Sequence, residues 1–178
     1  EELYGAAMDA LMSGNHSTAA LRFDELELQH PYSVWATRAQ LMAAFAYFKG
    51  DLYEDAVIAA RRFVQLHPSA EEVPYAYYLI ALSHYEQIVD VGRDQRATES
   101  ALQSLEELIR RYPASEYAAD ARLKVDLAID HLAGKEMEVG RYYLRRGNYL
   151  AAVNRFNQVV KKYQTTNHTP EALHRLAE

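Results

Sequence analysis

Residues 140–163 read GRYYLRRGNYLAAVNRFNQVVKKY and contain the clearest copy of a unit that recurs along the chain. Gly140 is a small residue, as expected where two helices touch, and Gly147 falls where a turn would join them. Phe156 and Val159 recur at helical spacing on one face. The stretch therefore predicts a hairpin of two helices.

The same marks recur in register along the chain. An alanine is followed twelve residues later by the position that ends the second helix, in the pairs Ala19 with Pro31, Ala56 with Pro68, Ala101 with Pro113, and Ala152 with Gln164. Apolar residues stand eight positions before each end, namely Phe23, Ala60, Leu105 and Phe156. These marks resemble the tetratricopeptide repeat, a helical hairpin of about 34 residues that stacks on its neighbours.

The repeats predict an all-α fold, a solenoid of stacked helical hairpins that forms a right-handed superhelix. We expect a single domain over residues 1–178, with repeats at 2–31, 33–68, 71–113 and 115–164 and the start of another at 169–178. Because that last helix stops after scarcely two turns, we expect the chain to be a piece of something longer.

Turn and capping residues predict where helices begin and end. Ser33 is expected to cap one helix, and Ser69 with Glu72 three residues later forms a capping-box pattern before another. The polar residues 90–95 are expected to form a loop between hairpins. Residues 115–146 are helical in pattern nearly throughout, so either one helix spans them or Gly134 breaks them into two; we expect one long helix bent near Ala133 and Gly134.

The composition narrows the classes of function. A net charge of −6 argues against nucleic acid as the main partner, and the absence of cysteine excludes disulfides and thiolate metal sites. None of the seven histidines has the spacing of a helical zinc motif, and no phosphate-binding loop or nucleophile elbow is present. We therefore expect no metal, no cofactor and no enzymatic activity.

Several short segments add a family resemblance. They are YEQI at 85–88, RDQ at 93–95, RRYP at 110–113, YAADA at 117–121, the stretch 140–163 and HTPEAL at 168–173. In this order they resemble the BamD family of outer-membrane assembly lipoproteins over essentially the whole chain.

The resemblance implies a protein at the periplasmic face of the outer membrane. Its partners would be the barrel-forming subunit of the assembly machinery, through the periplasmic repeat domains of that subunit, together with accessory lipoproteins and unfolded outer-membrane proteins. Membrane attachment is implied only through an N-terminal lipid, whose cysteine is absent from this sequence.

The 14 tyrosines offer candidates for a peptide groove. Substrates implied by the family end in a strand rich in aromatic and apolar residues, on which tyrosine rings can pack while their hydroxyls bond free backbone groups. The outer helices of the hairpins carry the candidates Tyr47, Tyr75, Tyr78 and Tyr85. The alternative is that tyrosines pack between helices with their hydroxyls at the surface.

The C-terminal part, residues 140–178, is expected to dock the barrel-forming subunit. Its candidate contacts are the basic residues Arg141, Arg145, Arg155 and Lys162, which gather on a chain that is acidic overall. The alternative is that these residues belong to ordinary solvated helix faces. Phe156 is expected to be buried and its neighbour Arg155 to lie on the surface.

A different repeat adaptor, such as a chaperone-docking module, is the competing function. A groove that grips a C-terminal carboxylate needs lysine and asparagine on the first outer helices. Here the corresponding residues are Tyr4, Met8 and Met42, so the sequence predicts an aromatic and apolar groove instead.

Overall fold

A computed structural model gives the structure of residues 2–88 and 95–178, and all regular secondary structure in these two ranges is helical. The helices are α1 (Glu2–Met12), α2 (His16–Gln29), α3 (Val34–Lys49), α4 (Tyr53–Leu66), α5 (Val73–Glu86), α6 (Gln95–Arg111), α7 (Glu116–Arg145), α8 (Tyr149–Lys162) and α9 (Thr169–Ala177). The loop expected at 90–95 lies outside the described residues except for Gln95, where α6 begins.

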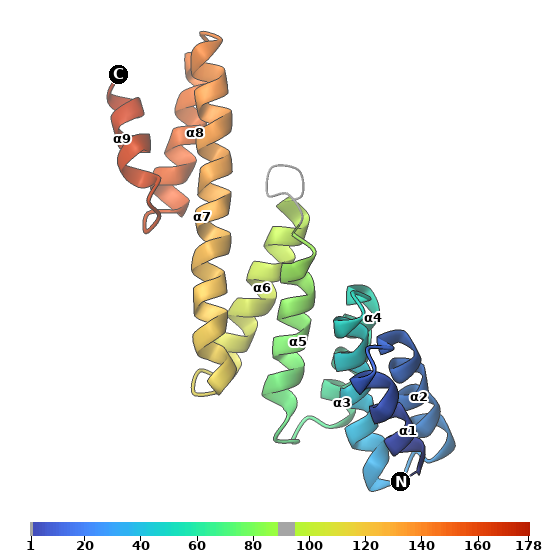
Figure 1. Cartoon of the computed structure of the whole chain (residues 1–178). Coiled ribbons are helices and arrows are strands. Elements are labelled where there is room, and N and C mark those ends of the chain that lie inside the picture. The colour runs from blue at the N-terminus through green and yellow to red at the C-terminus, as the bar shows by residue number, and fades with distance from the viewer. Residues whose placement is uncertain (1, 89–94) are drawn as a thin grey trace.

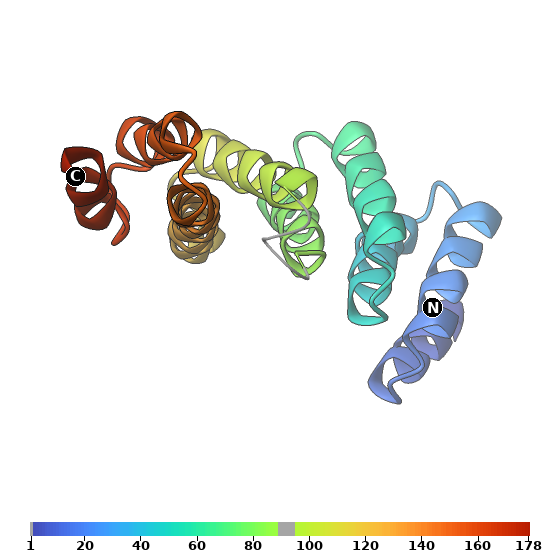
Figure 2. The same cartoon turned by 90° about the horizontal axis from the view of Figure 1, so that it is seen from above.

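Helices that follow one another in the chain pack side by side from α1 to α9, and α1, α3, α5 and α7 also contact one another in turn. Figure 1 shows the resulting row of antiparallel hairpins from the N-terminus to the C-terminus. Viewed from above in Figure 2, the row follows a curve. The predicted all-α fold of stacked, tetratricopeptide-like hairpins is confirmed, while its division into repeats within one domain stays a prediction.

The core lies between neighbouring helices, at the positions that recur in the sequence. The four anchoring alanines are at most 1% exposed, and so are Phe23, Ala60, Leu105 and Phe156. At Gly140 a Cβ atom would lie 2.5 Å from Cε1 of Phe156, so only glycine lets α8 approach α7 this closely. Gly147 has φ +73° in the turn between these helices, a conformation that favours glycine.

The helix ends confirm one predicted cap and contradict another. The Ser33 side chain accepts a hydrogen bond from the backbone N–H of Ala36 at 3.1 Å, as predicted. The capping box of Ser69 and Glu72 is wrong, because α5 begins only after Glu72, whose side chain makes no capping hydrogen bond. Backbone turns fill this segment instead, and Pro74 in the first turn favours the later start.

The long helix α7 is confirmed as one continuous helix of 30 residues, without a break at Gly134. Its N-terminal part packs with α5 and α6, whereas its C-terminal part packs with α8, so it joins two hydrophobic clusters. Gly134 has a packing role, since a Cβ there would lie 3.1 Å from Nε2 of His168. The glycine leaves room for the histidine ring.

Candidate functional site

Three tyrosines meet where α5 lies against α7. The ring of Tyr117 on α7 stacks on Tyr78, with centroids 5.0 Å apart and an angle of 26°, and lies 5.4 Å from the ring of Tyr75. Tyr85 follows on α5 two helical turns beyond Tyr78, and Nζ of Lys124 lies 5.4 Å from its ring centroid. We call Tyr75, Tyr78, Tyr85 and Tyr117 the tyrosine row.

The pKa values of two tyrosines in the row, Tyr75 and Tyr78, are raised. Burial raises the pKa of Tyr75 to about 12. Burial, together with a 2.6 Å hydrogen bond donated to Oδ2 of Asp120, holds the pKa of Tyr78 above its ordinary value. The same hydrogen bond, with help from Lys124, lowers the pKa of Asp120. The hydroxyl of Tyr78 is therefore already hydrogen-bonded to Asp120.

The sequence analysis singled out three members of the tyrosine row, Tyr75, Tyr78 and Tyr85. It did not single out the fourth, Tyr117, or the hydrogen-bond acceptor Asp120. Both lie within the YAADA segment, three residues apart and thus on the same side of a helix. That spacing was the available signal. Their contacts with α5 join residues that are distant in the sequence, 42 positions for Tyr78 and Asp120, and so could not be seen locally.

Tyr47 does not join the row. It lies on α3 in the N-terminal hydrophobic cluster, where its hydroxyl donates a 2.6 Å hydrogen bond to Oδ2 of Asp24 on α2. Burial, which outweighs this hydrogen bond, raises the pKa of Asp24. The structure therefore brings three of the four predicted groove tyrosines together and leaves Tyr47 in a separate helix contact.

A pocket of about 420 Å³ opens at the Tyr75 and Tyr117 end of the row, between the start of α5 and the start of α7. Its other lining residues are Glu71, Glu72, Pro74, Ser115 and Glu116. The pocket thus has an aromatic wall and carboxylates at its margin.

Two of the four predicted partner-binding residues are engaged within the chain. Nη1 of Arg155 donates to both carboxylate oxygens of Glu136, at 3.1 and 3.3 Å, and the side chain of Glu136 is only 6% exposed. The sequence predicts that Arg155 lies on the surface; its side chain is 38% exposed and also pairs with this buried carboxylate. Its neighbour Phe156 is 1% exposed, which confirms the expectation for that residue.

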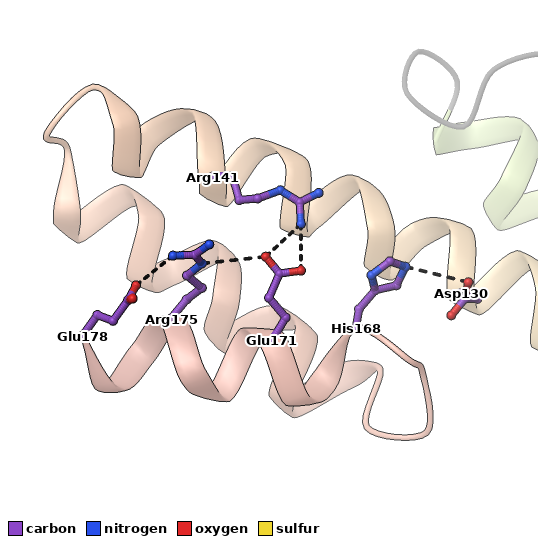
Figure 3. Close-up of polar contacts among 6 residues, drawn as sticks. All are labelled: Asp130, Arg141, His168, Glu171, Arg175 and Glu178. Carbon is purple, nitrogen blue, oxygen red and sulfur yellow. Dashed lines mark hydrogen bonds and ion pairs between the residues drawn. The ribbon is translucent and has the colours of Figure 1, made fainter.

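Arg141 is the second engaged residue. It donates from α7 to both oxygens of Glu171 on α9, at 2.9 and 3.1 Å, as Figure 3 shows. On the same side His168 Nε2 lies 3.8 Å from Oδ2 of Asp130, so two polar contacts tie the start of α9 to α7. Arg141 therefore links α7 to α9 in this structure.

The other two predicted residues, Arg145 and Lys162, are exposed. They belong to a segment, residues 139–170, that contains six arginines and lysines and no aspartate or glutamate. We call it the basic segment. Sequence reasoning did not single out Arg146, whose guanidinium lies 5.1 Å from the ring centroid of Tyr142.

Residues 2–88 and 95–178, the described part of the chain, contain neither a candidate metal cluster nor a helix able to span a membrane. No group of three or more histidine, aspartate or glutamate side chains is arranged to hold a metal ion within these ranges. In the same part of the chain, no helix has both the length and the apolar character that spanning a membrane requires.

Comparison with known proteins gives a match over the whole chain. The family model described as YfiO, outer membrane lipoprotein, matches residues 1–178. Proteins named outer membrane protein assembly factor BamD are similar to this chain: that of Caulobacter vibrioides is 51% identical over 178 residues, that of Rickettsia prowazekii 44% over 176, and that of Neisseria gonorrhoeae 38% over 183. These matches cover 100%, 99% and 97% of this chain and 58%, 70% and 68% of the respective relatives.

Proposed function

Because this chain belongs to the BamD family of outer membrane lipoproteins, we propose that it is a non-enzymatic scaffold in the assembly of outer-membrane proteins. The supporting observation is the similarity of the whole chain to relatives named as assembly factors. The proposed location is the periplasmic face of the outer membrane, with attachment by the N-terminal lipid of the complete protein. The chain spans little more than half of its Caulobacter relative, so the role is proposed for the whole protein.

The proposed main partner is the barrel-forming subunit, which docks through its periplasmic repeat domains on the C-terminal part of the chain; accessory lipoproteins join the same assembly. Exposed Arg145 and Lys162 in the basic segment provide charge that an acidic surface can meet. Arg141 and Arg155 contribute indirectly, because they hold α9 and the buried Glu136 in place. Charge of this kind mainly sets the orientation and rate of association.

The test of docking is the double variant Arg145→Glu with Lys162→Glu, measured for its association rate with the purified barrel-forming subunit at two salt concentrations. Reversal of two exposed charges is expected to slow association by about tenfold at low salt and by less at high salt, where screening weakens the repulsion. The matched control is Lys49→Glu with Arg61→Glu, two exposed basic residues of the N-terminal half. Equal rates for the test and control variants at low salt would contradict docking on this surface.

The second proposed ligand is an extended segment of an unfolded outer-membrane protein, bound along the tyrosine row. Tyr75, Tyr78 and Tyr85 are half-buried, so part of each ring remains accessible. The hydroxyls of Tyr47 and Tyr78 already donate to aspartates, so in this structure their hydrogens are not free to bond a peptide backbone. Recognition would therefore use ring faces, and the carboxylates around the 420 Å³ pocket would favour basic side chains in the peptide.

Photo-crosslinking tests this site. A crosslinking residue at Tyr85 is expected to capture a synthetic peptide that ends in an aromatic-rich strand, whereas one at Tyr47 is expected to capture little, because its side chain packs on α2. An equally reactive group at Lys161 serves as the control at the far end of the chain. Crosslinks confined to Lys161 would remove the tyrosine row from the proposed function.

A further inference from the structure

We propose that a cleft between the hairpin α3–α4 and the hairpin α5–α6 binds a short extended segment of another protein, in which an apolar and an acidic residue stand two positions apart. The cleft has a volume of about 250 Å³, and we call it the α4–α6 cleft. Its polar lining residues are Arg61 and Gln65 of α4 and Ser104 and Glu107 of α6. It contains no residue of the tyrosine row or the basic segment, so the inference does not depend on the proposed function.

The α4–α6 cleft lies on the other side of α5 from the tyrosine row. Tyr77, which lines the cleft, comes two residues after Tyr75, and residues two positions apart in an α-helix point to nearly opposite sides. Tyr75 accordingly contacts Tyr117 of α7, whereas Tyr77 contacts Tyr112 just after α6, with ring centroids 5.6 Å apart. In Figure 1 the hairpin α5–α6 stands between the hairpin α3–α4 and the long helix α7. A ligand can therefore occupy the cleft without contacting the row.

The floor of the cleft is apolar. Ile80 is only 6% exposed, and Val64 and Tyr77 are half-buried. Cζ of Arg111 lies 5.4 Å from the ring centroid of Tyr77 and covers one face of that ring. Burial raises the pKa of Tyr77, so its hydroxyl carries no charge at neutral pH. The floor therefore suits an aliphatic or aromatic side chain.

Arg61 gives the cleft a positive charge. Its side chain is exposed and makes no hydrogen bond or ion pair within the described part of the chain. Arg61 follows the anchoring Ala56 by five positions, where the other repeats have Asp24, Glu106 and Asn157. A positive charge at this position is thus particular to the second repeat. A free guanidinium suits a carboxylate, to which it can donate two parallel hydrogen bonds.

The opposite wall of the cleft does not cancel this charge. Nε of Arg111 donates to Oε1 of Glu107 at 2.8 Å, so the carboxylate of Glu107 is already paired. The hydroxyl of Ser104 donates to the backbone carbonyl of Ser100 at 2.9 Å, which leaves its oxygen able to accept from a ligand. With Glu107 and Arg111 neutral as a pair, Arg61 leaves the cleft positive and favours an acidic ligand.

The dimensions of the cleft favour a peptide over a small molecule. Small-molecule sites usually measure about 300–1,000 Å³, more than this cleft does. Arg61 and Gln65 are four positions apart on α4, or about 6 Å. Side chains two positions apart in an extended chain point to the same side at about this spacing. The exposed amide of Gln65 can both donate to a peptide carbonyl and accept from a peptide N–H.

The experiment uses a peptide probe with the sequence GSLSESG, in which a photo-reactive analogue replaces the leucine. The probe is irradiated with the purified full-length protein, and mass spectrometry locates the crosslinks. They are expected on the floor of the cleft, at Val64, Tyr77 or Ile80. A second probe with lysine in place of glutamate is expected to give a yield lower on the order of tenfold, because Arg61 then repels it.

Charge reversal in the protein gives the matched test. Arg61→Glu is expected to lower the yield of the glutamate probe on the order of tenfold and to raise that of the lysine probe. Arg110→Glu is the control and is expected to change either yield by less than about twofold, since Arg110 is an exposed residue of α6 outside the cleft lining. Because both arginines are exposed, both variants are expected to keep the thermal melt of the unmodified protein.

Four results would contradict this assignment. They are crosslinks on the tyrosine row instead of the cleft floor, equal yields for the glutamate and lysine probes, equal yields for Arg61→Glu and Arg110→Glu, and competition by hexanoate as strong as by the unlabelled peptide. The last result would assign the cleft to a small apolar acid. The comparison of the two probes uses the unmodified protein, so it decides the question even where a variant fails to fold.

Discussion

A buried glutamate that pairs with an arginine occurs near each end of the chain. The two glutamates differ in how many side chains bond to them. In the N-terminal region, Glu27 on α2 is 7% exposed and pairs with Arg62 on α4. In the C-terminal region, Glu136 on α7 is 5% exposed and pairs with Arg155 on α8. The first pair links α2 with α4 and the second links α7 with α8, so each pair joins two different helices.

The difference lies in what else each glutamate contacts. Nε2 of Gln40 donates to Glu27 at 2.7 Å, and Oε1 of Gln40 lies 2.8 Å from Nε2 of His67, so the N-terminal pair belongs to a network across α2, α3 and α4. The hydrogen bonds of Glu136 come from a single arginine nitrogen. Buried Glu136 therefore receives its hydrogen bonds from one side chain, whereas buried Glu27 receives them from two, Gln40 and Arg62.

The largest expected effect concerns a feature that the two regions share. Phe156 in the C-terminal region and Phe63 in the N-terminal region are both 1% exposed. Truncation of either to alanine leaves a cavity and is expected to cost about 3–5 kcal/mol of the free energy of unfolding. Urea denaturation followed by circular dichroism measures this loss, with Leu150→Ala, at an exposed site, as the control. A large loss at one phenylalanine and none at the other would show that the two cores are not alike.

The second expected effect separates the two regions. Arg155→Ala leaves the buried carboxylate of Glu136 without its partner and is expected to cost about 1–3 kcal/mol. Arg62→Ala is expected to cost less, about 1 kcal/mol, because Gln40 still donates to Glu27. Adding Glu136→Gln to Arg155→Ala removes the unpaired charge and is expected to restore most of the loss. Equal costs for the two arginine variants would contradict the comparison.

The sequence was informative where the cause of a structure is local. Gly147 requires a turn, Ser33 caps the helix that follows it, and the repeating alanine and phenylalanine positions mark the core. All of these were predicted and are present. The capping box at Ser69 failed because backbone turns and Pro74 offered another local solution. A capping pattern in the sequence can thus be correct at one helix, α3, and wrong at another, α5.

The roles of the basic residues depend on contacts that are not local. Arg155 pairs with a glutamate 19 residues away, and Arg141 with one 30 residues away. Neither spacing follows from a helical period or a turn, so the sequence could not separate them from exposed Arg145 and Lys162. For the same reason it could not show that Tyr47 packs apart from the other three tyrosines. The roles of all these residues in binding stay predictions.

The smallest expected effect compares two tyrosine–aspartate pairs, one near the N-terminus and one that joins α5 to α7. Tyr47 donates to Asp24 and Tyr78 donates to Asp120, both at 2.6 Å. The pKa of Asp24 is nevertheless raised from 3.8, chiefly by burial and in part by the nearby charge of Glu27, whereas the pKa of Asp120 is lowered from 3.8 by Tyr78 and Lys124. The surroundings of each carboxylate therefore decide the direction of its shift.

The two aspartates are expected to give stability opposite pH dependences. Since the folded-state pKa of Asp120 is lowered, its contribution is present above pH 3.8 and is lost as the pH falls through the folded-state pKa. Since that of Asp24 is raised, its contribution is present below pH 3.8 and is lost as the pH rises through the folded-state pKa. Urea unfolding of Asp120→Asn and Asp24→Asn between pH 3 and pH 7 measures both. Relative to the unmodified protein, Asp120→Asn is expected to lose stability as the pH rises and Asp24→Asn to gain it, and the same trend in both variants would mean that the tyrosine hydrogen bond, rather than burial, governs Asp24.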